Sequence, residues 1–281
     1  MKIHPLFLLK TKEILPESNV KVTSERQKQE IHLTDLKDFK HPLFDEVFYF
    51  NKLGSTSLKA ERLINSNTAQ GNFLCLAGEQ SSGKGRGKNS WVSPSGGLWL
   101  TAALYGFNFQ SNVTIFTGIC IHKTLSELFP SISDNLKIKW PNDIYLNDKK
   151  LCGILSSNFS GRKYHLIGIG LNTNVEELDE ILTPNATSLQ IELNKLVDNK
   201  EILTRIFDNF ASALPNFVEG KFDVKYFNQH SLLKGLHIEL DTDYDIFRGK
   251  VKGIDKNGAL LIELKPGMIQ PFYAGSVISW T

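Results

Sequence analysis

The sequence is poor in sulfur and has no long apolar run. Its 281 residues include three cysteines and two methionines. No two cysteines have the close spacing of a zinc or redox motif. Cys75 and Cys120 lie in apolar runs, as buried thiols do, so we expect free thiols in a reducing, cytoplasmic compartment. No stretch reaches the ~20 apolar residues that span a membrane. The short LFLL patch near the start has no cleavage site after it, so we expect no membrane partner.

An excess of charge of either sign is also missing. With 32 basic and 30 acidic residues, the formal net charge is +2. A chain that binds nucleic acid over a broad face usually has a larger basic excess, so we expect no nucleic-acid partner. No internal repeat is visible. The composition, 41% hydrophobic and 22% charged, is that of an ordinary globular protein, and the length suggests one or two domains.

Hydrophobic patterning divides the chain into three regions. Residues 1–43 are mixed in character and contain no helix pair with a tight glycine turn, so we expect an N-terminal extension. Residues 44–230 alternate between strand-like and helix-like segments. Strands are expected at 47–53, 73–80, 98–106, 136–140, 144–147, 151–157 and 164–172, and helices at 57–67, 112–129 and within 190–230. The links between 136 and 172 are too short for crossover helices, so these strands should be antiparallel.

The remaining region, 231–281, consists of short strand-like runs. They are expected at 237–240, 245–254, 259–264 and 272–280. Asn257-Gly258 is typical of a hairpin turn. The fold class predicted is therefore α+β: a mixed, largely antiparallel sheet backed by helices, plus a small C-terminal SH3-like β-barrel.

Residues 78–97, GEQSSGKGRGKNSWVSPSGG, form a glycine-rich basic segment in which we expect a loop over 81–97. Its G-x-x-x-x-G-K spacing imitates a P-loop, but Gly85 stands where Ser or Thr would hold Mg²⁺, and the glycines oppose the required helix. Alternating glycines still let backbone N–H groups approach an anion, and Lys84, Arg86 and Lys88 add cations. The segment is either an anion-binding loop or a solvated surface loop. Trp91 could cover a base or ring.

The tract Lys139-Trp140-Pro141-Asn142-Asp143 is the second informative stretch. Pro141 starts a turn. Asn142 and Asp143 either close that turn with their own side chains or offer oxygen ligands to Mg²⁺ or a nucleotide.

Two further polar residues lie at the ends of strand-like runs. Lys150 precedes the apolar run LCGIL, where it is either an edge-strand gatekeeper or a cation that neutralises a transferring group. Asn172 ends the run YHLIGIGLN and is either a turn residue or a ligand contact.

Together these stretches resemble the biotin–protein ligase family, also called holocarboxylase synthetases. The likeness covers about 44 to 281 and is carried by Gly54-Ser55-Thr56-Ser57, Glu79-Gln80, Gly83-Lys84-Gly85-Arg86-Gly87, Trp91 with Ser93-Pro94, Lys139 to Asp143, Lys150 with Gly153-Ile154-Leu155, Gly168 to Asn172, and Ala186-Thr187-Ser188-Leu189. The family usually has Asn at the position of Ser57 and often Arg at that of Lys84. GKGRGKNSW is closer to eukaryotic ligases than to bacterial repressor-ligases, whose winged helix has no counterpart in residues 1–45.

The resemblance implies a ligase that makes biotinoyl-5′-AMP from biotin and ATP with Mg²⁺ and then transfers biotin to a lysine. It implies a catalytic domain at 44–230 and, as partners, biotin carboxyl carrier domains of carboxylases such as acetyl-CoA carboxylase or pyruvate carboxylase. The implied residues are Ser55, Thr56, Ser57, Gln80, Lys84, Gly85, Arg86 and Lys150 for biotin; Gly83, Lys84, Arg86, Trp91, Lys139, Asn142 and Asn172 for ATP or the adenylate; Asn142 and Asp143 for Mg²⁺; and Lys150, Arg86 and Asp143 for catalysis. A lipoate–protein ligase, a biotin-sensing DNA-binding regulator and an inactive adenylate-binding module remain alternatives.

Overall fold

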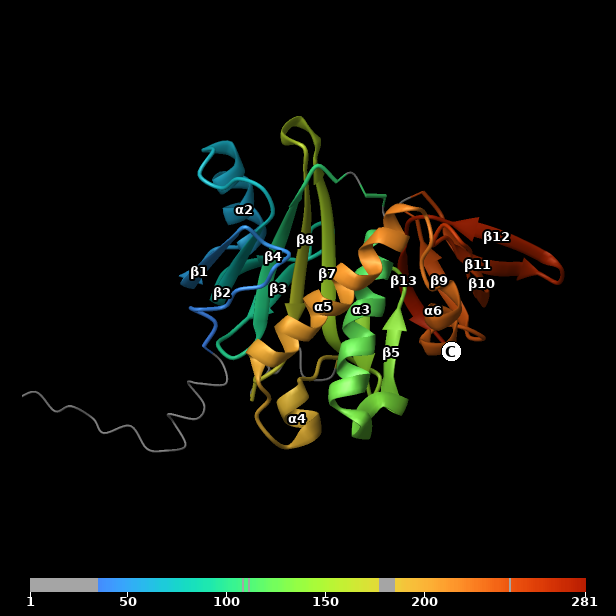
Figure 1. Ribbon diagram of the computed structural model, residues 1–281. Coiled ribbons are helices and arrows are strands. Elements are labelled where there is room, and N and C mark those ends of the chain that lie inside the picture. The colour runs from blue at the N-terminus through green and yellow to red at the C-terminus, as the bar shows by residue number, and fades with distance from the viewer. Residues whose placement is uncertain (1–34, 108, 111, 177–184, 243) are drawn as a thin grey trace, which may run out of the picture.

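The chain folds into a large sheet with helices on its faces and a smaller sheet at its C-terminal end (Figure 1). The structure is a computed structural model that describes residues 35–281, apart from 108, 111, 177–184 and 243. In this part of the chain no helix is long and apolar enough to cross a membrane.

The large sheet contains eight strands. They are β1 (Glu46–Leu53), β2 (Phe73–Lys84), β3 (Ser90–Ser93), β4 (Leu98–Tyr105), β5 (Leu136–Lys139), β6 (Asp143–Leu146), β7 (Lys149–Phe159) and β8 (Tyr164–Leu171). Their order is β1-β2-β4-β8-β7-β6-β5, with β3 paired to β2. Among the described strands β1 and β2 form the one parallel pair, and the other neighbours are antiparallel. The predicted mixed, largely antiparallel sheet is thus confirmed.

Helices cover both faces of this sheet. They are α2 (Thr56–Asn65), α3 (Val113–Leu128), α4 (Leu189–Leu193), α5 (Asn199–Val218) and α6 (Val224–His230), with short 3₁₀ turns η1 (Pro130–Asn135) and η2 (Ser160–Arg162). Side chains alternate along β2, as a strand requires. Leu74 and Leu76 join the core on the side of α3 and α5, whereas Phe73 and Cys75 join a cluster with α2. Both faces of the central strands are therefore buried, which explains their nearly continuous apolar sequences.

The residues just before β1 pack on α5. Leu36, Phe39 and Phe44 are buried, and His41 Nε2 lies 3.2 Å from the Asp208 carboxylate of α5. The edge of Phe44 meets Phe207, with ring centroids 4.7 Å apart. The last residues of the predicted N-terminal extension are thus part of the packed core, while its first 34 residues lie outside the described residues.

The small sheet has the order β12-β11-β10-β9-β13 and is antiparallel throughout. Its strands are β9 (His237–Asp241), β10 (Ile246–Ile254), β11 (Leu260–Lys265), β12 (Met268–Phe272) and β13 (Ser276–Trp280). The predicted turn at Asn257-Gly258 joins β10 to β11, and Gly258 has a φ of 85°, a conformation that favours glycine. The expected strand 272–280 is instead two segments, the end of β12 and all of β13, which stand at the two ends of the strand order.

This C-terminal module packs directly on the large sheet. The indole N–H of Trp140 donates to the carbonyl of Gly258 at 3.0 Å. The Asn228 side chain of α6 pairs with both the N–H and the carbonyl of Ile254, at 2.8 and 3.3 Å. Buried residues of the module, including Ile238 and Leu240, belong to the same apolar cluster as the helices of the large sheet. The two sheets therefore share one hydrophobic core.

Candidate functional site

A cavity of about 590 Å³ opens where the large sheet meets the C-terminal module. Its walls come from the start of α2, the β2–β3 hairpin, the β5–β6 turn, β7, β8 and the residues before β13. Most of the predicted site residues line it: Ser55, Thr56, Ser57, Gln80, Lys84, Gly85, Arg86, Trp91, Lys139, Asn142, Asp143 and Lys150. Gly83 and Asn172 are not among the lining residues.

Much of the glycine-rich basic segment is strand, which corrects the expectation of a loop over 81–97. β2 continues to Lys84 and β3 begins at Ser90, so five residues, 85–89, turn between them. A Cβ on Gly83 would lie 2.4 Å from the Trp91 carbonyl. Glycine there permits close pairing of two strands, a use that composition alone could not distinguish from flexibility.

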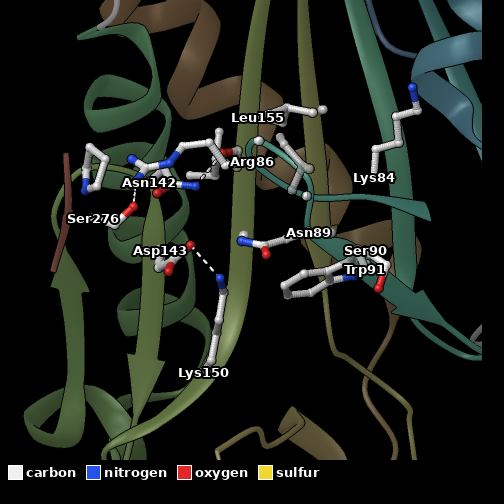
Figure 2. A pocket seen from close by; sticks show the side chains of 18 of the residues that line it. Lys84, Arg86, Asn89, Ser90, Trp91, Asn142, Asp143, Lys150, Leu155 and Ser276 are labelled. Carbon is white, nitrogen blue, oxygen red and sulfur yellow. Dashed lines mark hydrogen bonds and ion pairs between the residues drawn. The ribbon is translucent and has the colours of Figure 1, made fainter. Parts of the chain in front are cut away.

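Two glycines that face each other in the sheet make room for Trp91. Gly153 of β7 and Gly170 of β8 are register partners. A Cβ on Gly170 would lie 2.5 Å from the Trp91 indole nitrogen, and one on Gly153 would lie 2.9 Å from the ring. The tryptophan ring therefore rests on bare backbone inside the cavity, as Figure 2 shows.

Positive charge gathers around a single carboxylate beside this ring. Lys150 Nζ lies 2.8 Å from Asp143 Oδ1 (Figure 2), and 5.3 Å from the centre of the Trp91 ring. Burial lowers the pKa of Lys139 to about 8; Asp143 opposes this shift, whereas Lys150 and Arg86 reinforce it. An anion entering the cavity would relieve the mutual repulsion of these cations. Lys84, by contrast, points away from the Lys150–Asp143 pair in Figure 2.

The C-terminal module contributes to the same region. The Arg86 guanidinium donates to the carbonyl of Gly275 at 2.6 Å and to the hydroxyl of Ser276. Lys139 Nζ lies 4.0 Å from the centre of the Trp280 ring, a cation–π contact. Sequence reasoning missed Gly275, Ser276 and Trp280, because nothing local in β13 indicates contact with residues more than a hundred positions earlier.

Asn142 is both a turn residue and a cavity residue. Its amide N–H donates to the carbonyl of Ile154 at 2.9 Å, and its own backbone carbonyl accepts from the N–H of Ile154. The same residue lines the cavity. Asn172 is buried, and its amide donates to the carbonyl of Thr187 at 2.9 Å. In the structure Asn172 therefore holds a neighbouring segment in place.

A neutral polar network forms another part of the cavity wall. The N–H and the hydroxyl of Thr56 both donate to Gln80 Oε1, at 2.8 and 3.1 Å. The Gln80 amide in turn donates to Ser93 Oγ at 2.8 Å. Thr101 of β4 donates to Thr56 Oγ1 at 2.9 Å and also meets Ser57 Oγ at 3.2 Å. Sequence reasoning missed Thr101, although it is the one threonine in the mostly apolar run LWLTAALY.

The donor set does not form a protein cage for a metal ion. The described residues contain no group of three or more His, Cys, Asp and Glu side chains that could hold one. Asp143 and Asn142 offer oxygen atoms, but Lys150 already occupies one carboxylate oxygen. Mg²⁺ usually binds one or two carboxylates together with substrate phosphates. The site therefore fits a magnesium ion that arrives with a nucleotide, rather than a resident metal.

Comparison with known proteins matches both parts of the chain. The model of the biotin/lipoate A/B protein ligase family matches residues 47–174, and that of the biotin protein ligase C-terminal domain matches residues 235–280. The biotin–[acetyl-CoA-carboxylase] ligase of Paracoccus denitrificans is 31% identical over 218 residues, which is 73% of this chain and 90% of that protein. The bifunctional ligase/repressor BirA of Bacillus subtilis is 29% identical over 242 residues, or 82% of this chain and 73% of BirA.

Among solved structures, biotin protein ligase from Aquifex aeolicus in complex with biotin and ATP has a TM-score of 0.74 at 26% identity, covering 85% of this chain and 99% of that one. The fold, the cavity and these matches agree, and the chain belongs to the biotin–protein ligase family. Its reaction is the two-step attachment of biotin to a protein, with ATP and biotin as substrates. The leaning of its glycine-rich segment toward eukaryotic ligases stays a prediction.

Proposed function

We propose that this one cavity makes biotinoyl-5′-AMP and shelters it until transfer. The observation that carries the proposal is that the neutral polar network and the cationic cluster of Arg86, Lys139 and Lys150 line the same cavity. Biotin has a neutral ureido ring and a carboxylate tail, and ATP adds a polyphosphate. A site that combines neutral hydrogen-bonding groups with cations suits both ends of the adenylate.

The biotin ring is assigned to the polar network. Ser55, Thr56 and Ser57 at the start of α2 and Gln80 of β2 supply its hydrogen-bonding groups. The valeryl tail would then pass the Trp91 ring toward Lys150. Lys84 and Gly85 at the hairpin tip complete the proposed biotin contacts, and Gly83, Asn142 and Asn172 remain proposed nucleotide contacts.

In the first step a biotin carboxylate oxygen attacks the α-phosphorus of ATP, and pyrophosphate leaves. Lys150, Arg86 and Lys139 would hold the phosphate and carboxylate oxygens as negative charge shifts between them. Asp143 and Asn142 would hold Mg²⁺, which supplies charge neutralisation of the phosphates when bound. Lys150 is orientated for this role by its ion pair with Asp143.

In the second step the acceptor lysine attacks the acyl carbon of the adenylate, and AMP leaves. Only the neutral amine is nucleophilic, so a proton must be lost before or during the attack. Asp143 is the group proposed to assist the loss of this proton. Among the described cavity residues, its carboxylate is the one acidic side chain beside Lys150. The cations would stabilise the phosphate as it departs.

The hairpin is proposed to close over the adenylate and exclude water, since a mixed anhydride hydrolyses readily. Its turn, 85–89, is held by two backbone hydrogen bonds, from Gly85 N–H to the Asn89 carbonyl and from Asn89 N–H to the Arg86 carbonyl. Addition of biotin and ATP should therefore protect residues 80–97 from proteolysis. An unchanged cleavage pattern would contradict closure.

The proposed acceptor is a biotin carboxyl carrier domain of a biotin-dependent carboxylase, such as acetyl-CoA carboxylase or pyruvate carboxylase. Its support is the relative from Paracoccus denitrificans, which carries acetyl-CoA carboxylase in its name. We also propose an N-terminal extension at 1–43, a catalytic domain at 44–230 and a C-terminal domain at 231–281. The three buried, unpaired cysteines support a cytoplasmic location.

One assay tests the proposal: pyrophosphate release from ATP that depends on biotin, with and without a carrier domain, followed by the mass of the acceptor. We expect release with biotin and an acceptor heavier by one biotinoyl group. Lipoate in place of biotin separates this protein from a lipoate–protein ligase, and a gel shift with genomic fragments tests the DNA-binding regulator. No biotin-dependent release would leave the inactive adenylate-binding module as the better description.

A further inference from the structure

Thr101 lies beneath the proposed biotin site without reaching its wall. Its side chain is fully buried on β4, and it is not among the residues that line the cavity. It contacts two residues that do line it, Thr56 and Ser57. Its register partner on β8 is Gly168, whose missing side chain leaves space beside Ser57. Thr101 can therefore act on a ligand only through the hydroxyls above it.

The directions of the hydrogen bonds in this network follow from one fixed point. Gln80 Oε1 accepts the backbone N–H of Thr56, which sets the orientation of the Gln80 amide. The Thr56 hydroxyl must then donate to the same oxygen, so it accepts from Thr101. Thr101 has one proton, and that proton goes to Thr56. The hydroxyl of Ser57 must consequently donate to Thr101.

This order decides what the network presents to the cavity. The protons of Thr56 and Ser57 are engaged inside the protein, so both hydroxyls face the cavity as acceptors. Gln80 donates one amide proton to Ser93 and keeps the other for a ligand. Two acceptors and one donor match a cyclic urea, which has two N–H groups and one carbonyl.

We propose that Thr101 is a positioning residue that fixes this polarity and so selects the ureido ring of biotin. The proposal rests on the assignment of the biotin ring to this network. Without the Thr101 hydroxyl, the proton of Ser57 could turn into the cavity and oppose a ligand N–H, and Thr56 would lose a donor in a buried place. Thr101 thus sets specificity without touching the substrate.

The variant Thr101→Val keeps the shape and removes the hydroxyl. We expect the KM for biotin to rise about tenfold, the size of one unsatisfied buried hydrogen-bonding group. The KM for ATP and kcat at saturating biotin should change less than twofold. Thr101→Ser restores the hydroxyl and should restore the KM for biotin. A purely structural role for Thr101 would instead lower the activity with both substrates.

A biotin analogue methylated on a ureido nitrogen provides the decisive readout. Wild-type protein should bind biotin much more tightly than the analogue in calorimetry, and Thr101→Val should lose much of that preference. If Thr101→Val is too unstable, Thr101→Cys, a weaker donor of similar shape, should show the same trend at smaller size. Equal losses for both ligands, or an unchanged KM for biotin, would overturn the role of Thr101. A wild type indifferent to methylation would overturn the placement of biotin, and this proposal with it.

Discussion

The polar network and the cationic cluster line the same cavity but are built in opposite ways. The network of Thr56, Ser57, Gln80 and Thr101 is neutral, and its four members lie on three elements, α2, β2 and β4. The hydrogen bonds among its members are formed before any ligand arrives. The cationic cluster consists of charges from three separate segments around Asp143, and its arginine is held by the C-terminal module.

This difference separates recognition from chemistry. A neutral ring must be distinguished by the exact positions of donors and acceptors, which a rigid sheet supplies. Phosphate charge changes during the reaction, and it is stabilised by cations whose positions do not require the same rigidity. Changes in the network should therefore affect binding of biotin, whereas changes in the cluster should affect rates and binding of ATP.

The largest effect that sharpens this contrast is expected from Lys150→Ala. It removes the cation paired with Asp143, and we expect biotin-dependent pyrophosphate release to fall at least ~100-fold, the scale of losing one electrostatic contact to a transition state. Binding of biotin alone, measured by calorimetry, should change far less. Lys149→Ala, at a neighbouring position outside the cavity lining, is the control and should leave pyrophosphate release nearly unchanged. Full activity of Lys150→Ala would contradict the assignment.

The second largest effect is expected from Gly170→Ala. The added methyl group would lie 2.5 Å from the Trp91 indole nitrogen, so the ring must shift. Overpacking of this kind costs about 1–3 kcal/mol, and we expect kcat/KM for biotin to fall about tenfold. Gly161→Ala is the matched control, because nothing lies within 4 Å of a Cβ at that position. Equal activities of the two variants would show that Trp91 does not need its glycine support.

A smaller effect is expected from the pH dependence of Lys139. Its pKa is lowered to about 8, so it is charged below that pH and neutral above it. We expect kcat/KM for ATP to fall several-fold as pH rises through about 8. The free energy of unfolding should instead rise as the pH increases from about 8 toward the ordinary lysine pKa. In that range the unfolded chain binds more protons than the folded protein. Lys139→Arg stays charged and should lose the activity step; a step that persists in this variant would assign it to another group.

The smallest effect is expected from salt. Raising the ionic strength to about 0.5 M shortens the range of charge interactions to a few ångströms. We expect the KM for ATP to rise about two- to threefold while the KM for biotin stays nearly constant. Steady-state kinetics with each substrate varied in turn would check this. A parallel rise in both constants would remove the distinction between the two regions.

Much of the fold could be predicted because its signals are local. Long apolar runs gave the central strands, and the short links after Leu136 gave their antiparallel arrangement. β12 was missed because Pro271 breaks the strand pattern; the strand lies at an edge of its sheet, where proline is tolerated. The glycines around Gly83 were expected to form a loop, although Gly83 itself permits close strand pairing.

The residues of the site likewise differ in how far local sequence predicts them. Arg86, Asp143 and Lys150 could be predicted because each stands in a distinctive motif, and the structure brings all three to one cavity. Gly275 and Trp280 could not be predicted, because their contacts depend on how two sheets pack. Thr101 is an intermediate case: a threonine inside a buried, mostly apolar strand is a visible signal, but its partners come from α2, which only the fold brings close.

The hydrogen bond from Trp140 to Gly258 also affects how the protein unfolds. The indole lies in the tract that also contains Asp143 of the cavity, while its acceptor lies in the β10–β11 turn. Heat or denaturant should then dismantle both sheets in a single cooperative transition, visible as one calorimetric peak. We therefore expect that exchanging only one of the two matched regions with that of another protein would leave this shared contact unmade and lower the melting temperature.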